Sequence, residues 1–315
     1  AHATGQVKPD LRVKMLRPLG AARAALLCAS CSAWAAAGAY NETRALEFAR
    51  LAAAASCPEA SVESWTCGRN CAADVKDVKV CQGGIIQAFV GRWEGACVLS
   101  FQGTHDVWSV IADLRFHGGG IPWDGCQGCD VHKGFAEAYE GVKSCLVDAL
   151  RQRGCGEGSS LRSTGWSLGA AASNLAMVDL TAMGWRFSES YDFGRPRVGG
   201  PGFAKRFDSL FGASEGGAAV AWRVTHGSDP IPHLPPAYVP GAGWQWQHSE
   251  PEAFYPASVA DGHTECYLDS DLHCSAQHSD LAMDVLHVGD HFYYMDVRQG
   301  KAGCEAAPAP SERLI

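Results

Sequence analysis

The sequence has no excess of basic residues and no apolar run long enough for a membrane span, and each absence excludes a class of function. The 315 residues include 26 Lys and Arg against 34 Asp and Glu, which gives a formal net charge of −8. We see no basic stripe, so nucleic acid is not an expected partner. The uncharged stretch 24–40 is rich in alanine, and with 17 residues it is too short and too mildly apolar for a transmembrane helix.

The chain also lacks the motifs that bind common cofactors. It contains no dinucleotide-binding fingerprint, no P-loop, no EF-hand pattern and no internal repeat. We therefore expect no cofactor. With 47% apolar residues, a chain of this length can bury one large core as a single domain, and we expect a monomer.

The N-terminal region has the pattern of a secretory leader. Arg17 and Arg23 precede the uncharged stretch, and the alanines at 35–37 offer a cleavage site. An alanine-rich helix that belongs to the fold is the alternative. We predict an upstream extension and signal peptide over residues 1–37, a folded domain over 38–305 and a flexible tail over 306–315.

Fourteen cysteines fit a secreted, extracellular protein, because so many thiols would be unusual in a reducing cytosol. Removal of the predicted leader would remove Cys28 and Cys31 and leave twelve, an even number that suits disulfide bonds. The alternative is a zinc site built from Cys126, Cys129, His263, Cys266, His273 and Cys274. The spacing of these residues fits no zinc-finger pattern, so we expect no metal.

The segment Gly165-Trp166-Ser167-Leu168-Gly169 has the G-x-S-x-G form of a nucleophile elbow. A short strand-like run precedes it, and small and apolar residues that suit a helix follow it. Strand, sharp turn and helix are the context that the motif needs. The two glycines let the backbone segments approach each other without a clash of side chains. Ser167 is thus a candidate nucleophile; an ordinary turn serine is the alternative.

A serine nucleophile needs a histidine base and an acid that orients the histidine, and in hydrolases with this elbow both follow the serine in the chain. Asp229 lies on a loop after the strand-like run 221–225, where the acids of open α/β sheets lie. A turn aspartate before proline is the alternative. Asp192 is a further acid downstream, whereas Asp179 and Asp208 suit solvated helix faces.

Six histidines in the C-terminal part of the chain compete for the role of base. They are His248, His263, His273, His278, His287 and His291. His291 lies on a loop that leads into an aromatic run, and His287 lies one turn or strand repeat earlier. From the residues alone, the choice between these two stays open.

Five segments follow one another in the order known from one enzyme family. They are residues 100–104 (SFQGT), 131–139 (VHKGFAEAY), 191–199 (YDFGRPRVG), 223–236 (RVTHGSDPIPHLPP) and 290–294 (DHFYY). Together they resemble the class 3 lipases of the filamentous-fungal type, a family that also contains type A feruloyl esterases. The resemblance covers roughly residues 41–305.

The resemblance implies an α/β-hydrolase fold with a central mixed, mostly parallel sheet, flanked by helices and with a short lid helix over the active site. Ser167 matches the nucleophile, Asp229 the triad acid and His291 the base. Thr104 matches the oxyanion residue, and the amide of Leu168 would supply the second donor.

One position departs from the family pattern. The family usually has histidine before the serine, where this chain has Trp166. This position takes no part in the chemistry of a triad, so the mechanism is not in doubt. We expect the tryptophan to affect packing beside the pocket.

The segment that follows Thr104 suits an amphipathic helix, because its apolar residues fall along one helical face. In the family this segment is the lid, and an amphipathic lid is typical of the lipases rather than of the feruloyl esterases. A core helix packed permanently on the sheet is the alternative. The apolar residues are Val107, Trp108, Val110, Ile111 and Leu114.

The resemblance also implies four disulfide bonds. They are Cys57–Cys304, Cys67–Cys71, Cys126–Cys129 and Cys266–Cys274. For the four cysteines that remain, we expect Cys145 to pair with Cys155 and Cys81 with Cys97.

The local patterns predict an opening helix over 41–55 and later elements of both kinds. We expect strands near 85–90, 96–101, 161–165, 187–193 and 219–225, and helices near 134–152, 169–182 and 201–211.

The predicted function is that of a secreted serine carboxylic-ester hydrolase, a triacylglycerol lipase that acts at the lipid–water interface through an acyl-enzyme. A feruloyl esterase or another esterase for soluble esters is the first alternative. A non-catalytic binding member of the fold is the second.

Overall fold

The computed structural model describes one domain of the chain. The chain divides into two compact units, 1–36 and 37–315, and every described residue lies in the second. The predicted leader (1–37), the predicted tail (306–315) and the lid residues Val107, Trp108, Val110, Ile111 and Leu114 lie outside the described part, so these remain predictions. The described residues are 39–104, 106, 109, 119–212, 219–238, 241, 243–278 and 287–305.

An eight-stranded sheet forms the centre of this domain, in the order β1-β2-β3-β6-β7-β8-β9-β10. The inner strands from β3 to β9 run parallel, whereas β1 and β2 at one edge and β10 at the other pair antiparallel with their neighbours. The predicted mixed, mostly parallel α/β sheet is therefore confirmed. The strands are β1 (Lys76–Gln82), β2 (Gln87–Trp93), β3 (Ala96–Phe101), β6 (Ser160–Trp166), β7 (Arg186–Phe193), β8 (Ala221–His226), β9 (Glu252–Tyr255) and β10 (Thr264–Cys266).

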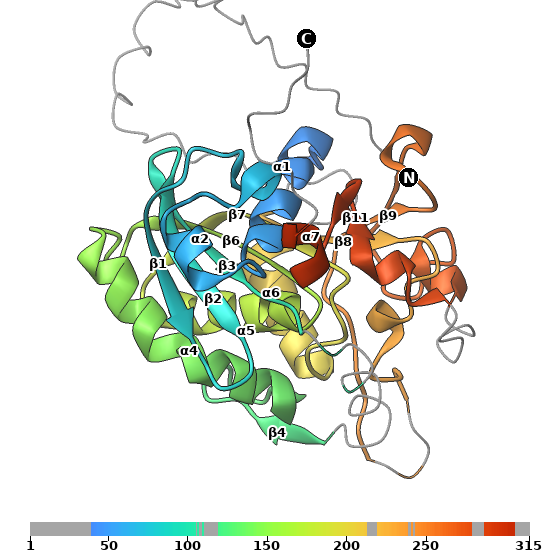
Figure 1. The fold of residues 1–315 in the computed structure, drawn as a ribbon. Helices are drawn as coiled ribbons and strands as arrows, with labels where there is room; N and C mark the ends of the chain where they lie inside the picture. Colours follow the sequence, from blue (N-terminus) through green and yellow to red (C-terminus); the bar gives the residue numbers. More distant parts are fainter. Residues whose placement is uncertain are drawn as a thin grey trace, which may run out of the picture. The chain divides into compact units, whose positions relative to one another are not determined.

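Helices lie on both sides of the sheet (Figure 1). On one side, α4 (Lys133–Gln152) packs beside α5 (Leu168–Ala182), and α6 (Pro201–Phe211) contacts α5. On the other side, α1 (Glu42–Ala54) lies against β6 and β7. Every residue of α5 from Leu168 to Leu180 is buried, because its many alanines let the sheet and α4 approach closely.

Shorter elements complete the described domain. They are α2 (Glu59–Glu63), the hairpin of β4 (Gly120–Pro122) and β5 (Asp130–His132), the pair β11 (Tyr293–Tyr294) and β12 (Val297–Arg298), and α7 (Lys301–Glu305), which contacts α1. None of the described helices is both long enough and apolar enough to span a bilayer.

The long helices and the central strands begin and end close to their predicted bounds. Three strands at the edges of the sheet, β1, β9 and β10, were not predicted from the sequence. β1 contains two lysines and an aspartate and is only partly buried, as an edge strand can be. β9 and β10 are short, with four and three residues, so they show too little alternation to be recognised.

Disulfide bonds join distant parts of the described chain. Cys81 of β1 is bonded to Cys145 of α4, and Cys97 of β3 to Cys155 just after α4. The expected pairs Cys145–Cys155 and Cys81–Cys97 are therefore wrong, because α4 lies across β1 and β2 and brings its cysteine to the sheet edge. The other bonds are Cys57–Cys304, Cys67–Cys71, Cys126–Cys129 and Cys266–Cys274.

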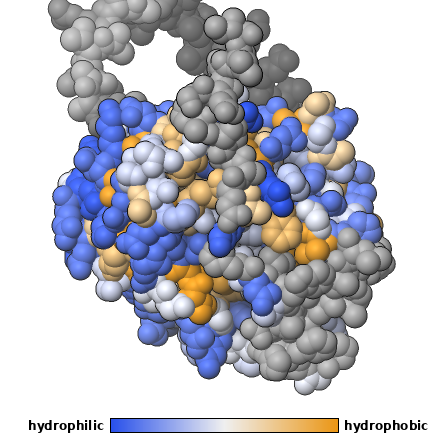
Figure 2. All heavy atoms as spheres, in the orientation of Figure 1, coloured by the Kyte–Doolittle hydropathy of each residue, from blue (hydrophilic) through white to orange (hydrophobic). Residues whose placement is uncertain are grey.

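The apolar core fills both sides of the sheet, and polar residues cover most of the outside. Trp166, Trp185 and Trp222 are each 1% exposed. On the face in Figure 2, hydrophilic residues dominate the coloured surface, and hydrophobic areas are small and separated. Such scattered apolar exposure is ordinary for a folded protein.

Candidate active site

Ser167 occupies the turn between β6 and α5, in a backbone conformation that side chains rarely adopt. Its φ is 58° and its ψ is −127°, and strain of this kind is concentrated at functional sites. Close packing on both sides fixes the turn: a Cβ at position 165 would overlap the carbonyl of Gly169, and a Cβ at 169 would overlap the carbonyl of Phe101. Both glycines of the motif are thus required by the backbone.

Asp229 and His291 are brought together although they are far apart in the chain. Asp229 follows β8, and its Oδ1 accepts a hydrogen bond from the amide of Ile231 at 2.8 Å. Its Oδ2 lies 2.7 Å from Nδ1 of His291. Both side chains are buried, with exposed fractions of 1% and 0%. The carboxylate therefore holds a proton on Nδ1 and leaves Nε2 able to accept one.

Tyr294 gives Asp229 a further hydrogen-bond donor that the sequence analysis did not identify. Its hydroxyl donates to the same Oδ2 that faces His291. Burial and the nearby Asp229 raise the pKa of Tyr294 well above its ordinary value, so the phenol keeps its proton. The sequence offered one indication of this role, which is that Tyr294 comes three residues after His291 in the aromatic run.

Ser167 and His291 each keep one polar atom without a hydrogen-bond partner in the described part of the chain. These atoms are Oγ of Ser167 and Nε2 of His291, and both are buried. The segments that carry them are neighbours, because the ring centre of Trp166, the residue before Ser167, lies 4.8 Å from that of the His291 imidazole. An unpaired hydroxyl and an unpaired imidazole nitrogen are what proton transfer from a serine requires.

The candidate oxyanion groups lie at the same end of the sheet as Ser167. Thr104 follows β3, and β3 pairs in parallel with β6 so that Phe101 is level with Gly165. Leu168 is the first residue of α5, where amides at a helix start point away from the helix without partners inside it. In this structure the Thr104 hydroxyl accepts a hydrogen bond from the amide of Asp106 at 3.2 Å.

The comparison with known families agrees with this geometry. Residues 98–239 match the family described as Lipase (class 3). This match and the curated relatives confirm the predicted resemblance to the class 3 lipases.

The curated relatives match this chain over part of their own length. The chain is 33% identical to secreted mono- and diacylglycerol lipase 1 of Fusarium solani over 52% of this chain and 45% of that protein. It is 31% identical to secreted mono- and diacylglycerol lipase 2 of Gibberella zeae over 45% of this chain and 40% of that protein. The chain thus spans less than half the length of these two relatives.

Solved structures match a larger part of this chain than the curated relatives do. One similar structure is a triacylglycerol lipase described as having a serine protease triad at its catalytic centre. It has a TM-score of 0.68 and 26% identity, and the match covers 85% of this chain and 98% of that chain. This likeness extends over nearly the whole described domain.

The three other candidate acids, Asp179, Asp192 and Asp208, have partners other than His291. Asp179 and Asp208 were expected on solvated helix faces; this expectation is wrong for Asp179, whereas Asp208 is partly exposed on α6. Asp179 is buried, accepts the hydroxyl of Tyr139 at 2.6 Å and pairs with Lys143 at 2.8 Å. Asp208 accepts the amide of Glu250, and burial raises its pKa. Asp192 is buried beside Arg195.

Two of the other candidate histidines, His287 and His248, do not suit the role of the base. His287 is exposed, whereas His248 is buried and its Nε2 lies 2.6 Å from the carbonyl of Pro232. Burial lowers the pKa of His248 well below its ordinary value. This neutral histidine therefore supports the loop that follows Asp229.

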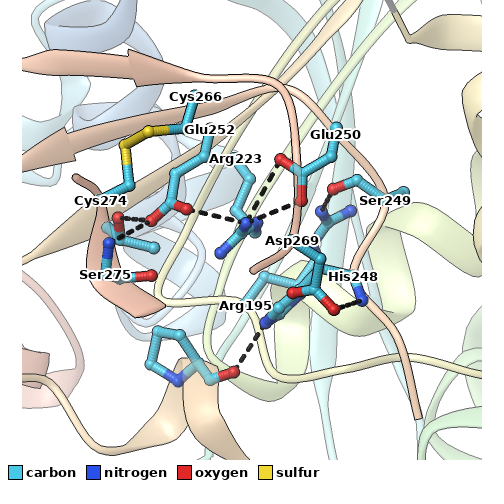
Figure 3. A network of polar contacts seen from close by, with 12 residues as sticks. Arg195, Arg223, His248, Ser249, Glu250, Glu252, Cys266, Asp269, Cys274 and Ser275 are labelled. Carbon is cyan, nitrogen blue, oxygen red and sulfur yellow. Dashed lines mark hydrogen bonds and ion pairs between the residues drawn. A yellow bond between two sulfur atoms is a disulfide. The ribbon is translucent and has the colours of Figure 1, made fainter. Parts of the chain in front are cut away.

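A cluster of charges with little exposure, Arg223, Glu250 and Glu252, lies beside the same loop (Figure 3). The guanidinium of Arg223 pairs with Glu252 at 2.9 Å and with Glu250 at 3.2 Å. Glu252 also accepts the amide of Ser275, the residue next to the disulfide-bonded Cys274.

The cysteines proposed as zinc ligands are all disulfide-bonded. Cys126 is bonded to Cys129, and Cys266 to Cys274. Zinc binds the thiolate form of cysteine, so these sulfurs are not available as ligands. Within the described ranges, no three side chains of the metal-binding types cluster as a site.

Proposed function

We propose that this protein is a serine carboxylic-ester hydrolase that acts on glycerides at a lipid–water interface. One observation carries the proposal: Asp229 lies 2.7 Å from Nδ1 of His291, while Nε2 of His291 and Oγ of the strained Ser167 are both buried and unpaired. The match of residues 98–239 to the class 3 lipases supports the same reaction class.

In the proposed mechanism, each group of the site has a defined role. His291 accepts the proton of the Ser167 hydroxyl at Nε2 as the oxygen attacks the ester carbonyl, and Asp229 stabilises the imidazolium that forms. The amide of Leu168 and the hydroxyl and amide of Thr104 bind the developing oxyanion. His291 then protonates the leaving alcohol, and in the second half it activates water to release the acid from Ser167.

The substrate class is inferred from the relatives and from the segment after Thr104. The two curated relatives are named mono- and diacylglycerol lipases, and the similar solved structure is a triacylglycerol lipase. The amphipathic pattern from Val107 to Leu114 supports a lid that would turn its apolar face to a lipid surface.

Secretion is part of the same proposal. Six disulfide bonds join the described cysteines, and structural disulfides of this number suit an oxidising compartment. The names of the curated relatives include the word secreted.

A fluorophosphonate probe and two substrates test the proposal on the oxidised protein. We expect the probe to label Ser167, as located by mass spectrometry of peptides, and we expect faster hydrolysis of an emulsified glyceride than of methyl ferulate. Absence of both label and hydrolysis would rule out the hydrolase. Faster cleavage of methyl ferulate would reject the glyceride assignment.

Tributyrin tests the interfacial part separately. The rate should rise abruptly where tributyrin exceeds its solubility, because the lid would then meet an interface. A smooth rise through that concentration would show that the lid proposal is wrong while leaving the hydrolase intact.

A further inference from the structure

Trp166 is a buried side chain at the site for which the proposed mechanism has no use. It is 1% exposed and ends β6, directly before Ser167. Its indole Nε1 donates a hydrogen bond to the main-chain carbonyl of His291 at 2.7 Å. Its ring also lies against the imidazole, with 4.8 Å between ring centres and 33° between ring planes.

The same indole reaches two further segments. Its ring centre lies 5.6 Å from that of Phe292, and a Cβ at position 300 would lie 3.3 Å from the indole. A Cβ at position 103 would overlap the ring. Gly103 thus has no side chain because the indole fills that space, and Gly103 directly precedes Thr104.

We propose that Trp166 is a positioning residue that fixes His291 and the Thr104 loop relative to Ser167. The inference rests on the proposed function. A single rigid side chain, attached next to the nucleophile, contacts the segment of the base and the segment of the oxyanion residue. Movement of either segment relative to Ser167 would require the indole to leave its buried position.

The physical reason lies in the two directions in which an imidazole can move. The hydrogen bond to Asp229 restrains His291 within the plane of its ring. That single contact leaves tilting about the hydrogen bond free, because the ring torsion of histidine is broad. The indole packed against the ring face opposes the tilt, and its bond to the His291 carbonyl holds the main chain.

Trp185 offers a matched control within the same β6–α5–β7 unit. It is also 1% exposed, and its indole Nε1 also donates to a main-chain carbonyl, that of Cys155, at 2.8 Å. It follows the end of α5 opposite to Ser167. Trp166→Phe and Trp185→Phe therefore make the same chemical change at equal burial, and only the first touches the site.

The experiment measures kcat and KM for soluble p-nitrophenyl butyrate, with active sites counted by fluorophosphonate labelling. For Trp166→Phe we expect kcat to fall about 10-fold at unchanged KM, since the donor is lost and the ring contact is kept. For Trp166→Ala we expect a fall of about 100-fold. For Trp185→Phe we expect the wild-type kcat per site, whatever its thermal stability.

Two results would overturn the inference. One is a kcat of Trp166→Phe equal to that of wild type, and the other is an equal fall in both phenylalanine variants. If Trp166→Ala fails to fold, the phenylalanine pair alone decides. A wild-type protein without esterase activity would refute the proposed function, and so the two failures are distinguished by the first measurement.

Discussion

Two buried carboxylates, Asp229 and Glu252, face different kinds of partner. Both are at most 2% exposed, and both accept a hydroxyl donor, from Tyr294 and Thr225 respectively. Asp229 meets an imidazole, whereas Glu252 meets the guanidinium of Arg223. An imidazole can gain and lose a proton near neutral pH, but a guanidinium cannot.

The difference indicates which polar region does chemistry and which holds the fold. At the Asp229 site, Ser167 Oγ and His291 Nε2 remain unpaired although they are buried. At the Arg223 cluster, opposite charges neutralise one another, and burial raises the pKa of Glu250 to about 8. Changes at the first region should therefore affect turnover, and changes at the second should affect folding.

Ser167→Ala should show the largest effect. Loss of a serine nucleophile typically reduces kcat by about 10⁶-fold, and the fold should persist because Oγ has no partner to lose. Hydrolysis of a soluble ester and urea unfolding measure the two quantities. Turnover close to wild type would remove Ser167 from the mechanism.

Ser173→Ala, in the helix α5 that follows Ser167, is the control. Its Oγ lies 2.6 Å from that of Ser163 and is buried. Loss of this hydrogen bond should cost about 1 kcal/mol of unfolding free energy and leave kcat unchanged. The variants at Ser167 and Ser173 would then separate an effect on catalysis from an effect on stability.

Arg223→Met tests the other region. It leaves Glu252 buried without its cation, which should lower the unfolding free energy by about 3–5 kcal/mol, while turnover per folded molecule is retained. Arg151→Met removes an ion pair with Glu157 in which Arg151 is 51% exposed, and it should cost about 1 kcal/mol or less. Equal losses in both variants would contradict the structural role of the cluster.

A further prediction concerns the pH dependence of stability at His233. Burial and the nearby Arg197 lower the pKa of His233 from 6.5 to about 4. The neutral form is therefore favoured in the fold, and its stabilising contribution is present above pH 6.5 and lost as pH falls through about 4. Relative to His233→Gln, the wild type should lose about 2 kcal/mol of unfolding free energy between about pH 7 and about pH 5.

The comparison with the variant is needed because Glu250 works in the opposite direction. Its pKa is raised to about 8 by burial, so its contribution is lost as pH rises rather than as it falls. Parallel pH profiles of wild type and His233→Gln, measured by urea unfolding, would contradict the prediction.

The elbow and the central strands could be predicted from the sequence because their signals lie within short segments. Gly165, Ser167 and Gly169 lie within five residues, and α5 is a continuous run of small apolar residues. The contact between Asp229 and His291 was predicted through the family resemblance, since the residues alone left His287 open. Their roles in catalysis stay predictions until activity is measured.

Contacts between different helices and strands were harder to predict from the sequence. The partner of Cys81 depends on which strands α4 crosses, and spacing along the chain contains no such information. The burial of Asp179 depends on the approach of Tyr139 and Lys143 from α4. Trp166 was recognised as unusual, but its bond to His291 required both segments in space.

The disulfide between Cys57 and Cys304 turns most of the domain into a covalent ring. Ser167, Asp229 and His291 all lie on the arc between these two cysteines. A protease that cut one surface loop of this arc would open the ring but release no fragment. Its product would still carry all three residues on one connected chain, so a single nick need not silence the enzyme.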